Sequence, residues 1–161
     1  MRLIAVDGPS GSGKSTWAAA LAGRLGAALV PTDHFATWDD PVSWWPRLVS
    51  GVLDPLWAGR PARYRRVDWS HGWPRPGAEV TFAVPEVLVL EGVSAARRSI
   101  ADRLDEAVWV EHPDPAGRLE RAVARDGERS RAHLVRWQSF ERGWFAVDGT
   151  RARADRVVTV D

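Results

Sequence analysis

An apolar segment near the start of the chain runs into a glycine-rich loop, and an alanine-rich segment follows the loop. Leu3–Val6 is short, apolar and partly β-branched, which predicts a buried strand. Ser15–Leu25, which is followed by Gly26, predicts a helix with a glycine cap. Between the two, residues 8–15 (Gly-Pro-Ser-Gly-Ser-Gly-Lys-Ser) match the pattern G-x-x-x-x-G-K-[ST] in full. This order predicts a loop whose backbone N–H groups bind a polyphosphate at the positive end of the helix.

The side chains of this loop are of the types that phosphate binding requires. Lys14 is expected to reach the β- and γ-phosphates, the Ser15 hydroxyl to ligate Mg²⁺, and Thr16 to contact the α-phosphate. A chance glycine-rich turn is the competing interpretation, but Lys14 is the only lysine among 22 basic residues and occupies the required position. The expected nucleotide-binding residues of the loop are Gly8, Ser10, Gly11, Ser12, Gly13, Lys14, Ser15 and Thr16.

Strands alternate with helices along the chain, which predicts a single α/β domain with a mostly parallel sheet and right-handed crossovers. Residues 59–84 interrupt that order with two extended segments, Tyr64–Trp69 and Ala78–Val84, which predict an irregular β-hairpin projecting from the core. The other expected strands are Ala28–Val30, Val87–Leu90, Ala107–Val110 and Arg156–Val160. The other expected helices are Val42–Trp57, which Pro46 and Pro55 could break, Pro115–Asp126 after Asp114 as N-cap, and Ala132–Phe145.

Composition excludes several classes of protein. The chain contains no cysteine, which excludes disulfides, cysteine-ligated zinc, iron–sulfur clusters and thiol nucleophiles, and its four histidines lack metal-ligand spacing. A net charge of +1, with basic residues spread along the chain, gives no footprint for nucleic acid. No apolar run is long enough to span a membrane, and the N-terminus lacks the features of a secretory signal. We therefore expect a cytoplasmic protein with neither nucleic acid nor membrane as a partner.

The loop pattern occurs in several classes of nucleotide-binding protein, and the rest of the sequence separates them. GTPases recognise guanine with an Asn-Lys-x-Asp segment, whereas this chain has no asparagine and no second lysine. A mechanical ATPase would be longer and would carry a strand ending in Asp or Asp-Glu, whereas the candidate strand here ends Leu90-Glu91-Gly92. A small-molecule kinase fits the size of the chain better.

Two acidic residues follow expected strands. Asp33 comes shortly after Ala28–Val30 and Glu91 directly after Val87–Leu90. Ligands of parallel α/β sheets bind at the carboxyl ends of the strands. Asp33 could accept the proton of an attacking hydroxyl or hold Mg²⁺ through water, and Glu91 could help to organise Mg²⁺. The competing interpretations are a turn or cap aspartate and a solvated glutamate at a strand end.

Arg121 and Arg125 lie four residues apart in an expected helix, with Arg118 three residues before Arg121, so that the three share a face. Their guanidinium groups could stabilise the charge of a transferring phosphoryl group. In a chain this rich in arginine, a solvated basic face is the competing interpretation. Residues 127–131 are expected to form a short mobile lid.

Six of the ten tryptophans lie between residues 38 and 73, which predicts an aromatic pocket on the acceptor side. Trp69 is the candidate for stacking on the acceptor, and Tyr64, Asp68 and His71 are the candidates for polar contacts with it. Tryptophan packs in the core more often than against a ligand. The tryptophans expected to pack in the core or on the surface are Trp17, Trp109, Trp137 and Trp144.

These segments resemble the uridine/cytidine kinase branch of the nucleoside kinases, a group that includes relatives of phosphoribulokinase and pantothenate kinase. Gly8–Thr16 is similar to the family's phosphate loop, and Thr32–Phe35 to its Asp-x-Phe/Tyr element beside the acceptor hydroxyl. Tyr64 with Val67–His71 resembles the hairpin that holds the nucleoside. Val87–Gly92 resembles a strand of the family that ends in Glu-Gly, and Arg118–Arg121 with Arg125-Asp126 resembles its lid helix. Asp148–Thr150 resembles a segment near adenine, and Ala154-Asp155 resembles the approach to the last strand.

The resemblance implies a three-layer P-loop NTPase fold with a small β-hairpin insertion at about residues 34–84 and a short helical lid at about residues 118–131. It also implies an ATP- and Mg²⁺-dependent kinase that transfers the γ-phosphoryl group to a hydroxyl of a nucleoside-like acceptor. Asp33 would be the base, Arg121 and Arg125 would contact the phosphoryl group, His34 and Glu91 would join the acceptor site, and Asp148 and Gly149 would join the nucleotide site. The residues leave open a kinase for another small alcohol, such as a sugar or an antibiotic, and a non-catalytic ATP-binding regulatory module.

Overall fold

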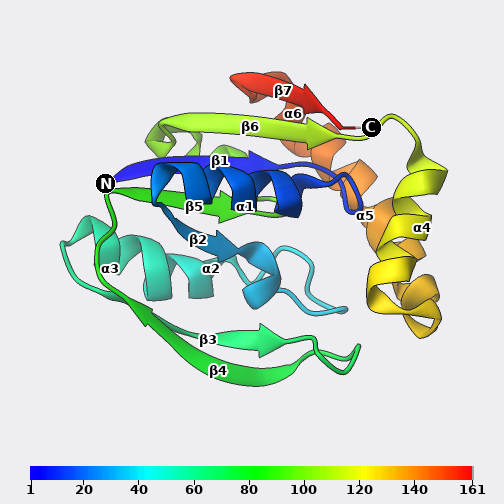
Figure 1. Cartoon of the computed structure of the whole chain (residues 1–161), viewed down its shortest axis with the longest axis horizontal. Coiled ribbons are helices and arrows are strands. Elements are labelled where there is room, and N and C mark those ends of the chain that lie inside the picture. The colour runs from blue at the N-terminus through cyan, green and yellow to red at the C-terminus, as the bar shows by residue number, and fades with distance from the viewer. Residues whose placement is uncertain (161) are drawn as a thin grey trace.

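The computed structural model describes residues 1–160, and a five-stranded parallel sheet lies at its centre (Figure 1). The strand order is β2-β5-β1-β6-β7, and every neighbouring pair runs parallel. The predicted α/β fold with a mostly parallel sheet is therefore confirmed. The strands of this sheet are β1 (Arg2–Asp7), β2 (Ala28–Pro31), β5 (Val87–Glu91), β6 (Glu106–Glu111) and β7 (Arg156–Thr159).

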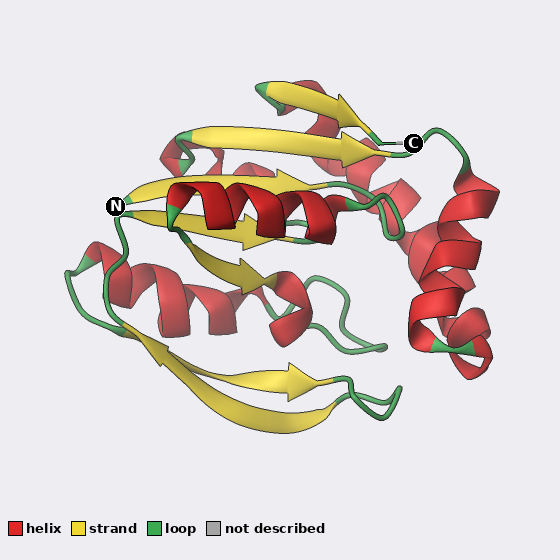
Figure 2. Cartoon of the chain, viewed as in Figure 1, coloured by secondary structure: helices red, strands yellow, loops and turns green. Residues whose placement is uncertain are grey.

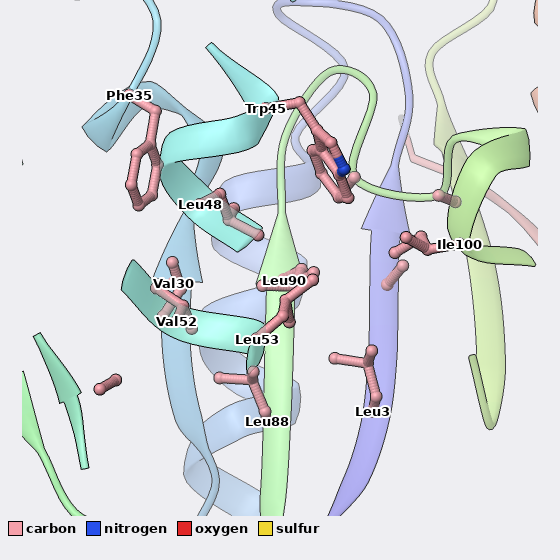
Figure 3. Packing of buried hydrophobic residues seen from close by; sticks show 14 of the residues in the cluster. Leu3, Val30, Phe35, Trp45, Leu48, Val52, Leu53, Leu88, Leu90 and Ile100 are labelled. Atoms are coloured by element: carbon pink, nitrogen blue, oxygen red, sulfur yellow. The ribbon is translucent and has the colours of Figure 1, made fainter. Parts of the chain in front are cut away.

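Helical segments cover both faces of the sheet (Figure 2). On one face, Ile4 and Val6 of β1 pack with the buried residues of α1 (Lys14–Leu25). On the other face, Leu3 and Ala5 pack with a helical run that spans residues 45–57. Successive side chains of a strand point to opposite faces, and the apolar residues of β1 therefore serve both layers. Figure 3 shows the second of these cores, in which Trp45, Leu48, Val52 and Leu53 lie over the sheet.

The helical run keeps both of its prolines without a break. It consists of α2 (Trp45–Leu48), a π-helical turn (Val49–Leu53) and α3 (Asp54–Trp57). Pro46 lies in the first turn of α2, where its missing N–H leaves no hydrogen bond unmade. Pro55 is the second residue of α3, with one residue between it and the π-turn, whose wider hydrogen-bond pattern replaces the regular helical one. Sequence analysis allowed breaks at both prolines, and the structure shows a local widening instead.

The predicted hairpin forms a separate two-stranded antiparallel sheet of β3 (Ala62–Asp68) and β4 (Arg75–Phe82). Both strands begin earlier along the chain than expected, and the register shifts between Arg65 and Val67. Ala62 and Tyr64 are buried whereas Arg63 and Arg65 are exposed, so that one face of β3 packs against the core. The hairpin tip, residues 69–74, projects toward the carboxyl ends of the parallel strands (Figure 1).

Two longer helices stand at the carboxyl ends of the strands (Figure 1). α4 (Pro115–Asp126) begins as predicted, with the Asp114 carboxylate accepting a hydrogen bond from the Ala116 N–H at 2.9 Å. α5 (Arg131–Asp148) extends beyond the expected end at Phe145, and α6 (Thr150–Arg153) follows it. The expected lid, residues 127–131, forms a 3-10 turn (Glu128–Ser130) that leads into α5, and its mobility stays a prediction. Within residues 1–160, no helix is long and apolar enough to cross a membrane.

Candidate active site

The glycine-rich loop leaves the middle strand of the sheet and curls over the first turn of α1. Gly8, Gly11 and Gly13 all have positive φ angles, which side chains with a Cβ rarely adopt. A Cβ at Gly8 would lie 2.0 Å from the carbonyl oxygen of Val110 in β6, and one at Gly11 would lie 2.2 Å from that of Arg118 in α4. The loop is therefore packed between the sheet and α4, in a conformation that only glycine permits at these positions.

The first turn of α1 has no side-chain cap among the described residues. Gly13 stands at the N-cap position, so that the first N–H groups of the helix keep their capacity for an anionic ligand. The Lys14 side chain is 8% exposed, and its Nζ donates to the Pro9 carbonyl oxygen at 3.3 Å across the loop. Uncapped amides and a folded-back lysine at one helix end form a site that can bind phosphate groups.

Ser15 and Glu91 bring two oxygen donors together at the edge of this loop. The Ser15 hydroxyl donates to Glu91 Oε1 at 3.0 Å, and Glu91 is the last residue of β5. Burial raises the pKa of Glu91, while the nearby Lys14 charge opposes that shift. A hydroxyl and a carboxylate oxygen are ligands of the type that Mg²⁺ prefers, and Mg²⁺ takes few protein ligands because it retains water. The donor set therefore fits a Mg²⁺ ion held beside the phosphates.

A cavity of about 370 Å³ opens next to the loop and joins its polar groups to an aromatic wall. Asp33, in a 3-10 turn (Thr32–His34) directly after β2, lines this cavity together with Lys14 and Ser15. The turn after β2 thus places a carboxylate in the same cavity lining as Lys14 and Ser15, and its role as a base stays a prediction. The lining residues are Ser10, Lys14, Ser15, Asp33, Trp38, Trp69, Ser70, Gly72, Val93, Arg125, Asp126, Ser130, Leu134 and Trp137.

The two candidate arginines of α4 lie in different surroundings. Arg125 lines the cavity and is fixed by Asp126, because its Nε and Nη2 each donate to a carboxylate oxygen at 2.6 Å. This pair raises the pKa of Arg125, and the charges of Asp33 and Glu91 add to the effect. Arg121 does not line the cavity; its Nε donates to the Gly11 carbonyl oxygen at 3.1 Å. Arg125 is therefore placed to meet a ligand, whereas Arg121 supports the loop from outside.

Three tryptophans from distant parts of the chain form the aromatic wall. Trp38 lies edge-on to Trp69 at 4.9 Å and to Trp137 at 5.7 Å between ring centroids. The Trp69 Nε1 donates to the Asp33 backbone oxygen at 2.8 Å, which ties the hairpin tip to the turn that carries the candidate base. Trp137 packs against the core, as expected, and it also lines the cavity. The sequence clue to this position was that Trp137 follows Leu134 by three residues, which places both side chains on one face of the helix.

Several other predicted acceptor residues lie outside the cavity lining. The His34 Nδ1 lies 2.9 Å from the Tyr64 hydroxyl, and burial lowers the pKa of His34 and raises that of Tyr64 to about 12. The Asp68 carboxylate accepts hydrogen bonds from the backbone N–H and the hydroxyl of Ser70, so that it shapes the hairpin tip. His71 is exposed and is not among the lining residues. Roles for these side chains in binding stay predictions.

The two residues predicted to contact adenine, Asp148 and Gly149, also lie outside the cavity lining. The Asp148 carboxylate accepts hydrogen bonds from the Arg98 N–H at 3.0 Å, the Thr150 hydroxyl at 2.6 Å and Arg153 Nη2 at 2.7 Å. Gly149 ends α5 with a φ of 69°. Both residues therefore join α5 to α6 and to the segment after β5, and a contact with the nucleotide base stays a prediction.

Solved structures of other proteins share the fold of this chain over nearly its whole length. A possible uridine kinase from Bacillus stearothermophilus has a TM-score of 0.62 at 17% identity, over 98% of this chain and 88% of that one. A shikimate kinase from Acinetobacter baumannii, in complex with shikimate, has a TM-score of 0.52 at 16% identity, over 100% of this chain and 84% of that one. The chain has the P-loop kinase fold. A shikimate kinase from Bacteroides thetaiotaomicron is similar as well, with a TM-score of 0.51 at 14% identity over 97% of this chain and 84% of that one. No protein-family description and no curated protein sequence matches the chain.

Proposed function

We propose that the chain is an ATP-dependent kinase that transfers the γ-phosphoryl group of ATP to a hydroxyl of a small molecule. One observation carries the proposal: a carboxylate, Asp33, lines the same cavity as Lys14 and Ser15 of the P-loop. A carboxylate in that place can accept a proton from a hydroxyl held between it and the phosphates. The P-loop kinase fold supports the proposal, because it places the loop and Asp33 at the same end of the sheet.

The residues divide the work of phosphoryl transfer between two sides of the cavity. On the nucleotide side, the loop N–H groups and Lys14 bind the phosphates, and Ser15 and Glu91 would hold Mg²⁺, which neutralises phosphate charge when it is bound. On the acceptor side, Asp33 orients the hydroxyl. The hydroxyl oxygen forms a bond to the γ-phosphorus, the bond from that phosphorus to the β–γ bridging oxygen breaks, and Asp33 takes the proton. Arg125 faces the transferring group from α4.

The lining of the cavity favours an uncharged acceptor with a flat or apolar face. Its cations are Lys14 and Arg125, which the phosphates would engage, while Asp33 and Asp126 add negative charge. An acceptor that carries a carboxylate, such as shikimate, would bury that anion without a partner on this side. The wall of Trp38, Trp69 and Trp137 suits stacking on a ring instead. A nucleoside-like acceptor is therefore our first candidate, and a neutral sugar or another small alcohol is the second.

The deciding experiment incubates the protein with Mg·ATP and single acceptors: uridine, cytidine, neutral sugars, and shikimate as the anionic comparison. We expect ADP formation that depends on one of the neutral acceptors, and a phosphorylated product whose mass exceeds that of the acceptor by one phosphoryl group. The Lys14→Ala variant is the control for contaminating kinases. Tight ATP binding with only slow, acceptor-independent hydrolysis would overturn the proposal and favour a regulatory module. Phosphorylation of shikimate would contradict the argument from cavity charge.

A further inference from the structure

A buried acid from α5, Glu141, contacts the P-loop at Ser10. Glu141 is 1% exposed, although charged side chains rarely stay buried without a specific partner. The Ser10 N–H donates to Glu141 Oε2 at 3.0 Å, and the Ser10 hydroxyl donates to Glu141 Oε1. Both oxygens of the carboxylate are therefore occupied by a single residue of the loop. Ser10 itself lines the cavity, so that this contact fixes one wall of the phosphate site.

The contact also belongs to a dense cluster of charge. Lys14 of α1 and Arg118 of α4 are the charged groups that face the Glu141 carboxyl. Lys14 is also within electrostatic reach of Asp7, at the end of β1, and of Glu91, at the end of β5. Asp7, Glu91 and Glu141 are all buried, so that three carboxyl groups surround the only lysine of the chain. Phosphate groups entering this site would bring further negative charge to the same lysine.

Glu141 shares a helix face with the acceptor-side wall. Leu134 and Trp137 of α5 line the cavity, and Glu141 follows Leu134 by seven residues, or about two turns. The buried residues of α5 are Leu134, Gln138 and Glu141. One rigid helix therefore contacts both the acceptor cavity and the P-loop.

We propose that Glu141 is a positioning residue of the P-loop and that its negative charge limits the affinity of the site for Mg·ATP. This inference rests on the proposed function only in taking Mg·ATP as the ligand. The phosphates and an ionised Glu141 compete for Lys14, and the bound state therefore favours the protonated carboxyl, which takes its proton from solvent. The carbonyl oxygen of the protonated carboxyl can still accept a hydrogen bond from Ser10, so that Glu141 keeps Ser10 in place without opposing the ligand.

The sign of the pH dependence follows from this linkage. Burial raises the pKa of Glu141 in the free protein, and bound phosphates would raise that pKa further. Affinity for Mg·ATP is then independent of pH below the free-state pKa, falls as pH rises toward the bound-state pKa, and levels off above it. Asp7 faces the same lysine and has a pKa raised to about 7, so that it can add a pH-dependent contribution of the same sign. A variant at position 141 separates the contribution of Glu141 from that of Asp7.

The test compares wild type with Glu141→Gln, which keeps an oxygen for Ser10 and removes the charge. Calorimetry gives the dissociation constants of both proteins for Mg·ATP at matched pH values across the range in which both stay folded, so that titration of the phosphate groups cancels in the comparison. We expect Glu141→Gln to bind about tenfold more tightly at the upper end, equivalent to a change of one pKa unit, and to show a flatter pH profile. The control is Glu120→Gln, which removes a charge from the exposed side of α4, where Glu120 pairs with Arg131, and should match wild type.

Each other outcome has a definite meaning. Weaker binding of Glu141→Gln with the wild-type pH slope would show a purely structural contact and overturn the inference. If the variant does not fold, the wild type decides: calorimetry in two buffers of different ionisation enthalpy should detect proton uptake on binding in the pH range where the affinity falls, and its absence refutes the inference. Normal Mg·ATP binding with the expected profile but no acceptor phosphorylation would refute the kinase proposal alone.

Discussion

Replacing Asp33 by asparagine tests the chemical step of the proposed reaction. The Asp33 side chain is exposed and lines the cavity, and the structural hydrogen bond at this residue, from Trp69 Nε1, goes to its backbone oxygen. The substitution keeps the shape and the backbone contact, so that stability should change by less than about 0.5 kcal/mol. Asparagine cannot take the hydroxyl proton. Loss of a positioned base lowers turnover by roughly 10²- to 10⁴-fold, which corresponds to about 3–5 kcal/mol of activation free energy.

The assay separates binding from chemistry. Coupled detection of ADP, with the acceptor found in the panel experiment, should give a kcat reduced by that factor and a KM for ATP within about twofold of wild type. Asp39→Asn is the matched control, because Asp39 is an exposed aspartate six residues further along and does not line the cavity. Asp33→Asn with wild-type turnover would refute the assignment of Asp33 as base. A melting temperature lowered by several degrees would instead identify Asp33 as a structural residue of the turn.

Three further substitutions test other parts of the site. Lys14→Ala should abolish ATP turnover and lower the melting temperature, because the buried carboxyl groups near Lys14 lose its charge; unchanged turnover would remove the P-loop from the mechanism. Trp69→Ala should weaken acceptor binding by about 1–3 kcal/mol, measured by fluorescence titration, with ATP affinity unchanged; equal losses for both ligands would indicate a collapsed hairpin. Burial raises the pKa of Asp7 to about 7, so that its folded form binds a proton more tightly than its unfolded form. Stability in urea should therefore decrease as pH rises from about 4 to about 7, and Asp7→Asn should reduce that slope.

The P-loop could be predicted from the sequence because it is a local structure. Eight consecutive residues carry the whole pattern, and the strand before them and the helix after them are visible in the adjacent residues. Asp33 was predictable for a related reason. The carboxyl ends of parallel strands lie along one edge of the sheet, so that a carboxylate following β2 lies at the same edge as the loop that follows β1, with β5 between the two strands.

The contacts of α5 could not be predicted in this way. Ser10 and Glu141 are 131 residues apart, and no local pattern links them. An amphipathic helix shows which face is buried but not which element covers it. Glu141 on that face was the available clue, because a charged residue amid buried positions requires a specific partner. Its partner follows only from the way α4 and α5 stand over the ends of the strands (Figure 1).

The acceptor side of the cavity is likewise formed by contacts between residues that are far apart in the sequence. Trp38, Trp69 and Trp137 come from the segment after β2, the hairpin tip and α5, and each taken alone is explained by ordinary packing. Tyr64, which resemblance assigned to the acceptor, packs against Phe35 in the core at 4.8 Å between ring centroids, and its acceptor role stays a prediction. The alternation of β3 turns Tyr64 inward, and the hairpin tip beyond it carries Trp69 into the cavity. The proposed function therefore assigns acceptor recognition to the tip of the hairpin and to α5, and phosphate binding to the loop that follows β1.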